Sequence, residues 1–372
     1  MANQAVGVIF SNIHDDNIPE LSHHRTMASI PFGGRYRLID FALSNMVNSG
    51  ITTVGIVTKN NYQSLIDHIG SGKDWDLARK DGGIVLLPPY YDENEAPYTN
   101  RLEALKGITG FLNRRKEEYV VISDCDAIAR VDIADVIHYH ESKHSDFTMV
   151  YHEEKGEYHS SYFLTLDPDA SGRVKGVKIN PKLKKNEKFN LYINIMVFNR
   201  EFLINIIQDA VTRGLSSFGR DILTKNLDTL KVYAYKFDGY FAGINSLEKY
   251  FQHSMELLEK DVRSELFGAR DIYTKVRDSA PSKYTENAIV KNSLISDGCV
   301  IDGTVENCIL FRGVNVGKGS VIKNSILMQD TVVGSDVQLD CVITDKNAVI
   351  RDRRHLAGCE TLPYFIAKGK MI

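Results

Sequence analysis

The feature that most restricts the fold of this 372-residue chain is a short repeat in its last quarter. From about Ala288 onward, pairs of apolar residues recur mostly every six residues or at a near multiple of six, and glycines fall in the polar gaps. A hexapeptide period gives one strand and one turn per side of a triangular coil, with an apolar residue pointing inward and Gly, Asn or Asp at the corner. An antiparallel sandwich, the alternative, would space its turns by about 8–12 residues. The repeat therefore predicts a left-handed parallel β-helix. The pairs are Ile289-Val290, Leu294-Ile295, Val300-Ile301, Ile309-Leu310, Val321-Ile322, Ile326-Leu327, Val332-Val333, Val342-Ile343 and Val349-Ile350.

The residues before this repeat alternate between strand and helix patterns. Residues 5–10 form a short apolar run, residues 37–48 carry a helical apolar stripe, and residues 51–58 return as a strand, which makes one βαβ unit. Alternation of this kind indicates a doubly wound α/β domain. We therefore expect an α/β domain at 1–275, a linker at 276–287 and the β-helix at 288–372. Further strands are expected near 84–87, 119–122, 147–151, 162–166, 191–198 and 232–237, and helices near 201–212 and 246–259.

Composition excludes several classes of protein. The net charge of −3 leaves no basic surplus, so we expect no nucleic-acid partner. No apolar run is long enough to span a bilayer and the N-terminus does not resemble a signal peptide, so we expect a cytoplasmic protein without a membrane partner. The five cysteines are odd in number and lack C-x-x-C spacing. They are interpreted as small buried hydrophobes rather than disulfides or a zinc site.

Several long motifs resemble one enzyme family. Residues 31–50, which begin Pro31-Phe32-Gly33-Gly34-Arg35, resemble the signature of ADP-glucose pyrophosphorylases (glucose-1-phosphate adenylyltransferases), as do residues 68–77, 86–90, 272–277, 281–283 and 290–301. The resemblance covers nearly the whole chain. It implies a Rossmann-like nucleotidyltransferase domain with a mixed sheet, followed by a left-handed β-helix. It also implies a reaction in which glucose 1-phosphate attacks the α-phosphate of ATP, supported by Mg²⁺ and by cations around the phosphates.

The segment that should hold the triphosphate departs from the family pattern. Active relatives place a glycine-rich loop after the first strand, whereas residues 11–21 here contain no glycine and no arginine. Three carboxylates, Asp15, Asp16 and Glu20, stand there instead. Carboxylates repel a polyphosphate. We therefore expect an ordinary surface loop rather than a phosphate cradle.

The family's cations and metal ligands are also altered. The resemblance places Met27 and Asn180 where active relatives carry lysines, and it aligns Asp126 with one metal-binding aspartate. The second metal-binding aspartate aligns with Phe241. The family's sugar-site motif aligns with residues 100–104, and its base-reading pair aligns with residues 58–59. This sequence differs from the family at both places. Because of these changes we assign no catalytic residue, and we expect Asp126 to be at most a vestigial metal position. Mg²⁺ and ATP are expected only if the chain is active.

A basic cluster lies beside the Phe-Gly-Gly motif, where family members bind anionic sugar-phosphate effectors. It consists of His24, Arg25, Arg35 and Arg37, and Arg353 and Arg354 could extend it from the β-helix. Arginine binds phosphate in a bidentate manner, so a regulatory anion site is one interpretation. A network of ion pairs between domains or subunits is the other.

These departures resemble the non-catalytic D-type subunit found beside an active subunit in some bacterial glycogen-synthesis systems. The sequence therefore predicts a regulatory, catalytically weak or inactive subunit whose partner is a catalytic subunit of the same family, assembled as a heterotetramer. One alternative is an active adenylyltransferase with an unusual phosphate loop. Another is a stand-alone effector-binding or scaffold protein.

Overall fold

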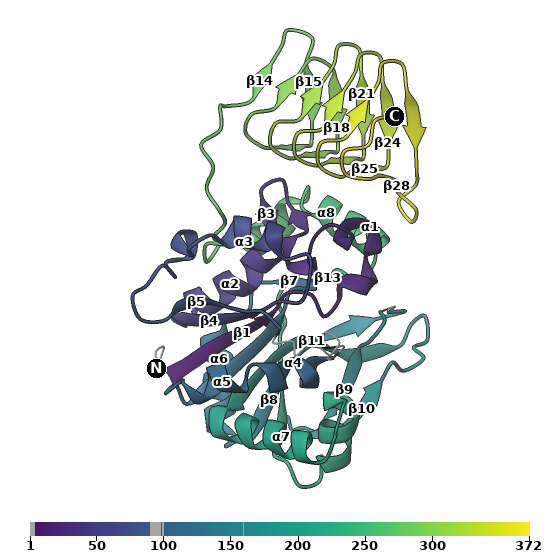
Figure 1. The fold of residues 1–372 in the computed structure, drawn as a ribbon. Coiled ribbons are helices and arrows are strands. Elements are labelled where there is room, and N and C mark those ends of the chain that lie inside the picture. Colours follow the sequence, from purple (N-terminus) through teal and green to yellow (C-terminus); the bar gives the residue numbers. More distant parts are fainter. Residues whose placement is uncertain (1–3, 90–97, 99, 159) are drawn as a thin grey trace.

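The computed structural model describes residues 4–89, 98, 100–158 and 160–372 (Figure 1). Tyr90, the last residue of one family motif, lies outside the described residues. The chain folds into an α/β domain and a C-terminal coil of parallel strands, as the sequence predicts. No helix in the described ranges is long and apolar enough to cross a membrane.

The N-terminal domain is built on a mixed nine-stranded sheet with the order β10-β9-β11-β6-β1-β4-β5, and β8 and β12 extend it from β11. Strands β6, β1, β4 and β5 are parallel, whereas β11 runs antiparallel to β6. All six residues of β1 are buried, which explains their continuous apolar pattern. The strands are β1 (Ala5–Phe10), β4 (Thr53–Val57), β5 (Gly83–Leu87), β6 (Tyr119–Asp124), β8 (Phe147–Lys155), β9 (Leu164–Pro168), β10 (Val174–Ile179), β11 (Lys188–Asn199) and β12 (Val232–Lys236), with two small pairs, β2 (Pro31–Phe32) with β3 (Tyr36–Arg37) and β7 (Ala127–Ala129) with β13 (Phe241–Gly243).

Helices cover this sheet, and α2 (Leu38–Asn48) lies within the first family motif. In α2, Asp40 accepts a hydrogen bond from the backbone N–H of Arg37 at 3.0 Å and also contacts Nε2 of His68 at 2.6 Å. The buried Asp40–His68 contact joins the first family motif to the second. The helices are α1 (Pro19–Ser22), α2 (Leu38–Asn48), α3 (Gln63–Ile69), α4 (Arg101–Gly107), α5 (Thr109–Asn113), α6 (Ile133–Ser142), α7 (Arg200–Thr212), α8 (Leu247–Glu256) and α9 (Lys260–Phe267).

The C-terminal coil consists of three parallel sheets of five strands each. Each sheet is named here after its first strand. The β14 sheet contains β14 (Lys283–Tyr284), β17 (Val300–Ile301), β20 (Asn315–Val316), β23 (Val332–Val333) and β26 (Val349–Ile350). The β15 sheet contains β15 (Ile289–Lys291), β18 (Thr304–Glu306), β21 (Val321–Lys323), β24 (Gln338–Asp340) and β27 (His355–Ala357). The β16 sheet contains β16 (Leu294–Ile295), β19 (Ile309–Leu310), β22 (Ile326–Leu327), β25 (Val342–Thr344) and β28 (Tyr364–Ile366).

The coil begins earlier than predicted. Strand β14 pairs with β17 through Lys283 and Tyr284, which lie inside the predicted 276–287 linker. These two residues are not an apolar pair, so the repeat pattern gives no signal for this first strand. Four cysteines are buried as expected, but Cys359 is exposed because it lies in a turn after β27, outside the coil interior.

The β16 sheet attaches the coil to the N-terminal domain. Ile309, Ile326 and Ile343 belong to the same buried cluster as Tyr250 and Leu257 of the α8 region. Their neighbours in sequence point the other way, into the interior of the coil. In Figure 1, β25 and β28 lie on the side of the coil that faces the N-terminal domain. The two domains therefore share one core across this sheet.

Left-handed residues make the corners of the coil. Asn292, Asn307 and Asn324 have φ values of 40°, 52° and 44° and occupy one corner in successive turns. The Nδ2 of Asn292 donates to Oδ1 of Asn307 at 2.8 Å, and the Nδ2 of Asn324 donates to Oδ1 of Asp340 at 2.9 Å. Asparagine tolerates this conformation, and the stacked amides also satisfy one another. The corner residues expected from the sequence are thus confirmed.

Two neighbouring residues of β21 provide a test of the coil's core. Ile322 is fully buried, whereas Val321 is turned outward and partly exposed. We expect Ile322→Asp to lower the free energy of unfolding of the coil by about 3–5 kcal/mol, because its carboxylate would lack a partner. Val321→Asp should cost about 1 kcal/mol or less. Urea unfolding followed by circular dichroism checks the difference, and equal losses in the two variants would contradict the inward orientation of Ile322.

Candidate functional site

Two acids lie where the parallel strands end. Strand β6 finishes at Asp124, and Asp126 follows before β7. Because Phe10 pairs with Asp124, the segment after β1 begins beside these acids. This edge, at the carboxyl ends of parallel strands, is where open α/β sheets bind ligands. Asp126, which the family resemblance aligns with a metal-binding aspartate, lies at this edge.

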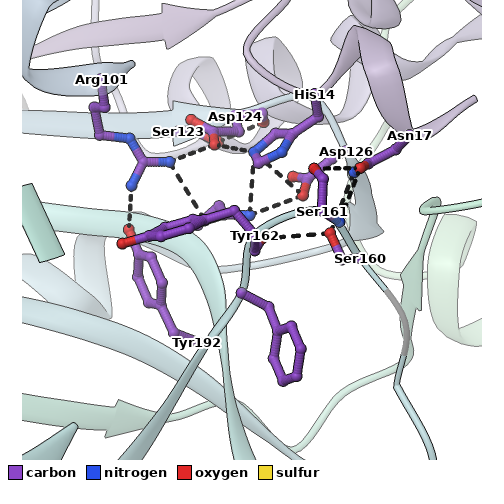
Figure 2. Close-up of polar contacts among 12 residues, drawn as sticks. His14, Asn17, Arg101, Ser123, Asp124, Asp126, Ser160, Ser161, Tyr162 and Tyr192 are labelled. Atoms are coloured by element: carbon purple, nitrogen blue, oxygen red, sulfur yellow. Dashed lines mark hydrogen bonds and ion pairs between the residues drawn. The ribbon is translucent and has the colours of Figure 1, made fainter. Parts of the chain in front are cut away.

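The segment after β1 delivers a histidine to the acid pair. Nε2 of His14 lies 2.7 Å from Oδ2 of Asp124 and 3.5 Å from Oδ2 of Asp126. His14 and Asp124 are buried. Figure 2 shows the imidazole directed at the two carboxylates.

An arginine reaches the same carboxylate from α4. The guanidinium of Arg101 donates from Nη2 to Oδ2 of Asp124 and, at 3.3 Å, to Oδ1 of Asn194. Asn194 donates in turn from Nδ2 to Oδ2 of Asp126 at 2.8 Å. The β11 ladder is irregular here, and Asn194 has a φ of 60°, which turns its amide toward the site. Arg101, Asn194 and His14 thus enclose the acid pair (Figure 2).

The electrostatics of the cluster favour an internal ion pair. Burial disfavours the charged form of Asp124, but the positive charge of Arg101 and the contact with His14 outweigh it and lower the pKa of this carboxyl. Burial likewise disfavours charge on His14, but Asp126 and Asp124 raise the pKa of the imidazole. Buried charges are tolerated when they are paired in this way. The negative charge of Asp124 is therefore balanced by side chains of this chain.

The residues present do not fit the Mg²⁺ of an active relative. Ligand atoms of His14, Asp124 and Asp126 lie within 4.8 Å of one another, and Oδ1 of each aspartate has no hydrogen-bond partner among the described residues. However, Mg²⁺ requires oxygen ligands in near-ideal octahedral geometry. Here a guanidinium and an imidazole occupy Oδ2 of Asp124. Phe241, which the family resemblance aligns with the second metal-binding aspartate, stacks its ring on His152 at 5.3 Å between centroids.

The segment after β1 forms no cradle for phosphates. It folds into a single 3₁₀ turn, Asp15–Asn17, followed by the short helix α1. Oδ1 of Asp15 accepts a hydrogen bond from the backbone N–H of Met27 at 2.6 Å. Burial raises the pKa of Asp15 to about 7. The N–H of Met27, at the family's lysine position, is thus committed within the protein.

A pocket next to the acid cluster is poor in cations. It has a volume of about 690 Å³, and Asp16, Glu157, Tyr158, Asn180 and Lys182 are among its lining residues. Asn180, where active relatives have a lysine, accepts a hydrogen bond at Oδ1 from the backbone N–H of Phe163 at 2.8 Å. Its amide is neutral and supports the pocket wall. Position 180 therefore contributes no cation to this pocket, although Lys182 is among the lining residues.

The predicted basic cluster divides into separate groups. Arg35 and Arg37 line a cleft between the domains together with Lys275, Arg277, Arg312 and Lys346. Arg25 is buried and pairs with both carboxylate oxygens of Asp345 at 2.8 Å, which is the ion-pair alternative. The cleft lining includes neither His24, which is exposed, nor Arg353 and Arg354, which lie at another corner of the coil. Burial and the charges of Arg37 and Arg25 lower the pKa of Lys346 to about 7.

Sequence reasoning missed several residues of the acid cluster. It assigned no role to His14, Arg101 or Asn194, which come from three distant segments. A signal was present nonetheless, because both acids near the end of β6 are retained while the family's lysines are lost. Retained buried acids require replacement cations. That requirement points to basic residues in the two altered motifs, at 11–21 and 100–104.

Comparison with known proteins agrees with this fold. A family model for nucleotidyl transferases matches residues 18–260, and one for the GlmU-like C-terminal hexapeptide matches residues 279–359. The chain belongs to the nucleotidyl transferase family.

Curated relatives of this nucleotidyl transferase family member extend the similarity over its length. The glycogen biosynthesis protein GlgD of Bacillus subtilis (strain 168) is 34% identical over 99% of this chain and 96% of its own length. A glucose-1-phosphate adenylyltransferase of Fervidobacterium nodosum is 33% identical over 95% of this chain and 85% of its own. One of Clostridium botulinum (strain Eklund 17B) is 34% identical over 87% and 84%. The family resemblance stated from the motifs is thus confirmed.

Removing the internal cation tests the electrostatic balance of the site. In Arg101→Met, His14, Asp124 and Asp126 keep three ligand atoms within 4.8 Å but lose the guanidinium. We expect this variant to bind Mn²⁺ about tenfold or more tightly than the parent, because a competing positive charge is gone. Calorimetry measures the affinity, and added Mn²⁺ should raise the melting temperature of the variant alone.

Arg115→Met is the matched control, since Arg115 lies on the neighbouring segment and contacts the ring of Phe111 instead of the acids. Equal Mn²⁺ affinity in Arg101→Met and the parent protein would show that Arg101 does not hold the site closed to a cation.

Proposed function

We propose that this chain is a regulatory, catalytically weak or inactive subunit of glucose-1-phosphate adenylyltransferase, acting beside an active subunit in glycogen biosynthesis. The observation that carries the proposal is the internal neutralisation of the acid pair. Arg101 and His14 both contact Oδ2 of Asp124. Phosphoryl transfer depends on a metal and on cations placed around the phosphates. In this chain the cations are bound to the acids instead.

The neighbouring positions support the same conclusion. Met27 and Asn180 offer no positive charge, and the segment after β1 brings Asp15 and Asp16. Asn17 also bonds to Ser160 and Ser161, at 3.3 and 2.7 Å, and so ties this segment to the far side of the pocket. The first two positions lack cations that would stabilise a triphosphate, and the two acids repel its negative charge. Together these changes support a chain that keeps the family fold but has little or no catalytic activity.

The partner in this proposal is a catalytic subunit of the same family, and the assembly is a heterotetramer. The chain keeps both domains and nearly the full length of its relatives. A subunit without chemistry acts through its surfaces, so conservation of the whole architecture supports a role in assembly.

An active enzyme is the second candidate. Asp124 and Asp126 are retained, and their Oδ1 atoms are without partners among the described residues. In this candidate a nucleotide-bound metal would displace Arg101. The two candidates differ in whether the purified chain alone releases pyrophosphate from ATP and glucose 1-phosphate.

The proposal makes a direct prediction about mixed assemblies. We expect the chain alone to release pyrophosphate at least about a thousandfold more slowly than the active subunit. We also expect Asp126→Asn to leave the kcat of the mixed assembly within about twofold, because Asp126 holds no catalytic metal. The aligned Asp→Asn change in the active subunit is the control and should lower kcat by orders of magnitude.

Two outcomes would oppose the proposal. A collapse of kcat with Asp126→Asn at full assembly would establish the active-enzyme candidate. No effect of the chain on any catalytic subunit would favour a stand-alone binding or scaffold protein.

We further propose that the cleft between the domains, which has a volume of about 30 Å³, takes the phosphate group of an anionic effector such as a sugar phosphate. Arg35, Arg37, Arg277 and Arg312 line it with Lys346. The neighbouring acids are Asp40, Asp67, Asp297 and Asp345. Asp345 bonds to Arg25, Asp40 contacts His68, and Asp297 accepts a hydrogen bond from Arg312 at 3.1 Å. Burial, together with the positive charges of Arg37 and Arg25, lowers the pKa of Lys346 to about 7. An anion placed there would relieve this repulsion.

This cleft gives a pH-dependent prediction. Since the unliganded Lys346 has a pKa near 7, it is largely neutral above that pH, and anion binding requires uptake of a proton. Affinity for a sugar phosphate should therefore fall as pH rises from about 6 to 8. Lys346→Gln should weaken binding about tenfold at pH 6 and flatten the pH profile.

Calorimetric titration with glucose 1-phosphate and fructose 1,6-bisphosphate measures both effects. Arg354→Gln removes an exposed arginine outside the cleft and serves as the control. An unchanged pH profile in Lys346→Gln would exclude this lysine from the site.

A further inference from the structure

One corner of the coil changes from asparagine to cysteine. Asparagines follow the first three strands of the β15 sheet, whereas Cys341 follows the fourth strand, β24. The φ of Cys341 is 51°, close to the 52° of Asn307, so the backbone turns in the same way. Asparagine is common in this left-handed conformation and cysteine is not. The corner geometry therefore gives no reason for a cysteine at this position.

The next turn of the coil brings a second cysteine beside Cys341. The backbone N–H of Tyr364 donates to the carbonyl oxygen of Cys341 at 2.9 Å, and a Cβ on Gly358 would lie 2.7 Å from the same oxygen. Between Gly358 and Tyr364 the chain leaves the coil as a hairpin, in which Cys359 and Leu362 exchange backbone hydrogen bonds at 3.1 and 3.0 Å. Cys359 is therefore the first residue after the strand position that covers Cys341.

The two cysteines lie on the outside of the coil. Cys299 and Cys308 belong to the buried cluster in the coil interior, whereas Cys341 belongs to the core that is shared with the N-terminal domain. Its Sγ lies 3.7 Å from Oδ1 of Asp340, a residue at the surface. Cys359 is exposed, and in Figure 1 the hairpin before β28 extends from the coil toward the N-terminal domain. A small molecule can therefore reach this pair of thiols.

The spacing of the two positions suits a disulfide. Disulfides join residues whose Cα atoms are about 4.4–6.8 Å apart, and adjacent strands of a sheet lie about 4.8 Å apart. Gly358 occupies the rung next to Cys341, and Cys359 follows it directly. Burial and the neighbouring Asp340 raise the pKa of Cys341 to about 11, and Cys359 contributes to this rise, as a nearby thiol does.

The exposed thiol is the more reactive of the two. The hydroxyl of Thr361, whose Oγ1 lies 3.5 Å from Sγ, and the backbone of Leu362 lower the pKa of Cys359. The negative charge of Glu248 in α8 acts in the opposite direction, which places the hairpin near this helix. Exposed cysteines with a lowered pKa are the ones that attack disulfides.

We propose that Cys341 and Cys359 form a reversible disulfide, with Cys359 as the attacking thiolate and a low-molecular-weight disulfide such as glutathione disulfide as the oxidant. In a reducing compartment such a bond is transient and reports the thiol–disulfide balance. It would tie the hairpin to the coil beside α8. The inference is independent of whether the chain performs chemistry.

The reaction consists of two thiol–disulfide exchanges. The thiolate of Cys359 attacks one sulfur of glutathione disulfide, forms a mixed disulfide and releases one glutathione thiolate. The thiol of Cys341 then loses its proton to water, and its sulfur attacks the Cys359 sulfur of the mixed disulfide and releases the second glutathione thiolate. The two cysteines are thereby oxidised, and glutathione disulfide is reduced to two thiols.

The first experiment treats the purified full-length chain with glutathione disulfide and maps its disulfides by mass spectrometry without reduction. Trypsin cleaves after Lys346 and Arg354, so the two cysteines fall on separate peptides that only a covalent bond can join. The expected product is this joined pair, lighter by two hydrogen atoms than the separate peptides, and dithiothreitol should release it. A treated chain without the joined pair, or with glutathione on Cys359 alone, would overturn the proposal.

Substitutions assign the order of the two steps. Cys341→Ser should stop at the mixed disulfide on Cys359. In Cys359→Ser, glutathione should add to Cys341 at least about tenfold more slowly, because this thiol is buried and protonated. Cys308→Ala, the matched control, changes a cysteine of the coil interior and should form the cross-link like the parent.

Circular dichroism confirms that each variant is folded. Cross-linked peptides that contain Cys308 instead of Cys341 would assign the pair wrongly and overturn the proposal. Equal rates of glutathione addition in Cys341→Ser and Cys359→Ser would equally contradict the role of Cys359 as the attacking thiolate.

Discussion

The site depends on the cost of burying one carboxylate. Asp124 terminates β6 in the interior of the sheet edge, where its negative charge requires compensation. His14 and Arg101 supply it from two segments that are far apart in the sequence, and Asn194 completes the arrangement from the irregular part of β11. The charge of Asp124 thus constrains the three chain segments that carry His14, Arg101 and Asn194. The acids at this edge of the sheet are thus enclosed in a buried cluster with an arginine and a histidine.

Sequence patterns predicted the fold because the relevant signals are local. The apolar run of β1 and the hexapeptide pairs report burial within a few residues, and they identified both domains. Strand β14 was missed because Lys283 and Tyr284 carry no apolar pair, although they complete the ladder with β17. The acid cluster was only half predicted, through Asp126, because its other members meet only when β1, β6, β11 and α4 are assembled. The basic residues near the Phe-Gly-Gly motif likewise looked equivalent in sequence, but burial separates Arg25, which pairs with Asp345, from Arg37, which lines the cleft.

The domains are coupled by neighbouring residues of one turn in the coil. Asp345 forms a buried ion pair with Arg25, and the next residue, Lys346, lines the cationic cleft. The shared core around Ile326 and Ile343 holds the coil against the N-terminal domain. A change of charge in the cleft therefore acts at the boundary between the two domains. This boundary is also connected to α2 through Arg37 and Asp40. A change in the cleft can therefore influence the helix that carries the first family motif.

The asparagine corners have a consequence for how the coil can change over evolutionary time. Each turn contacts chiefly the turn before and the turn after it, and Asn292, Asn307 and Asn324 repeat the same backbone conformation. Such a coil is modular, so gain or loss of a whole turn at its free end leaves the remaining ladder in register. The length of the coil, and with it the reach of its outer faces, can vary while the contact with the N-terminal domain stays constant. The coil can therefore differ in length between related chains while its contact with the N-terminal domain is kept.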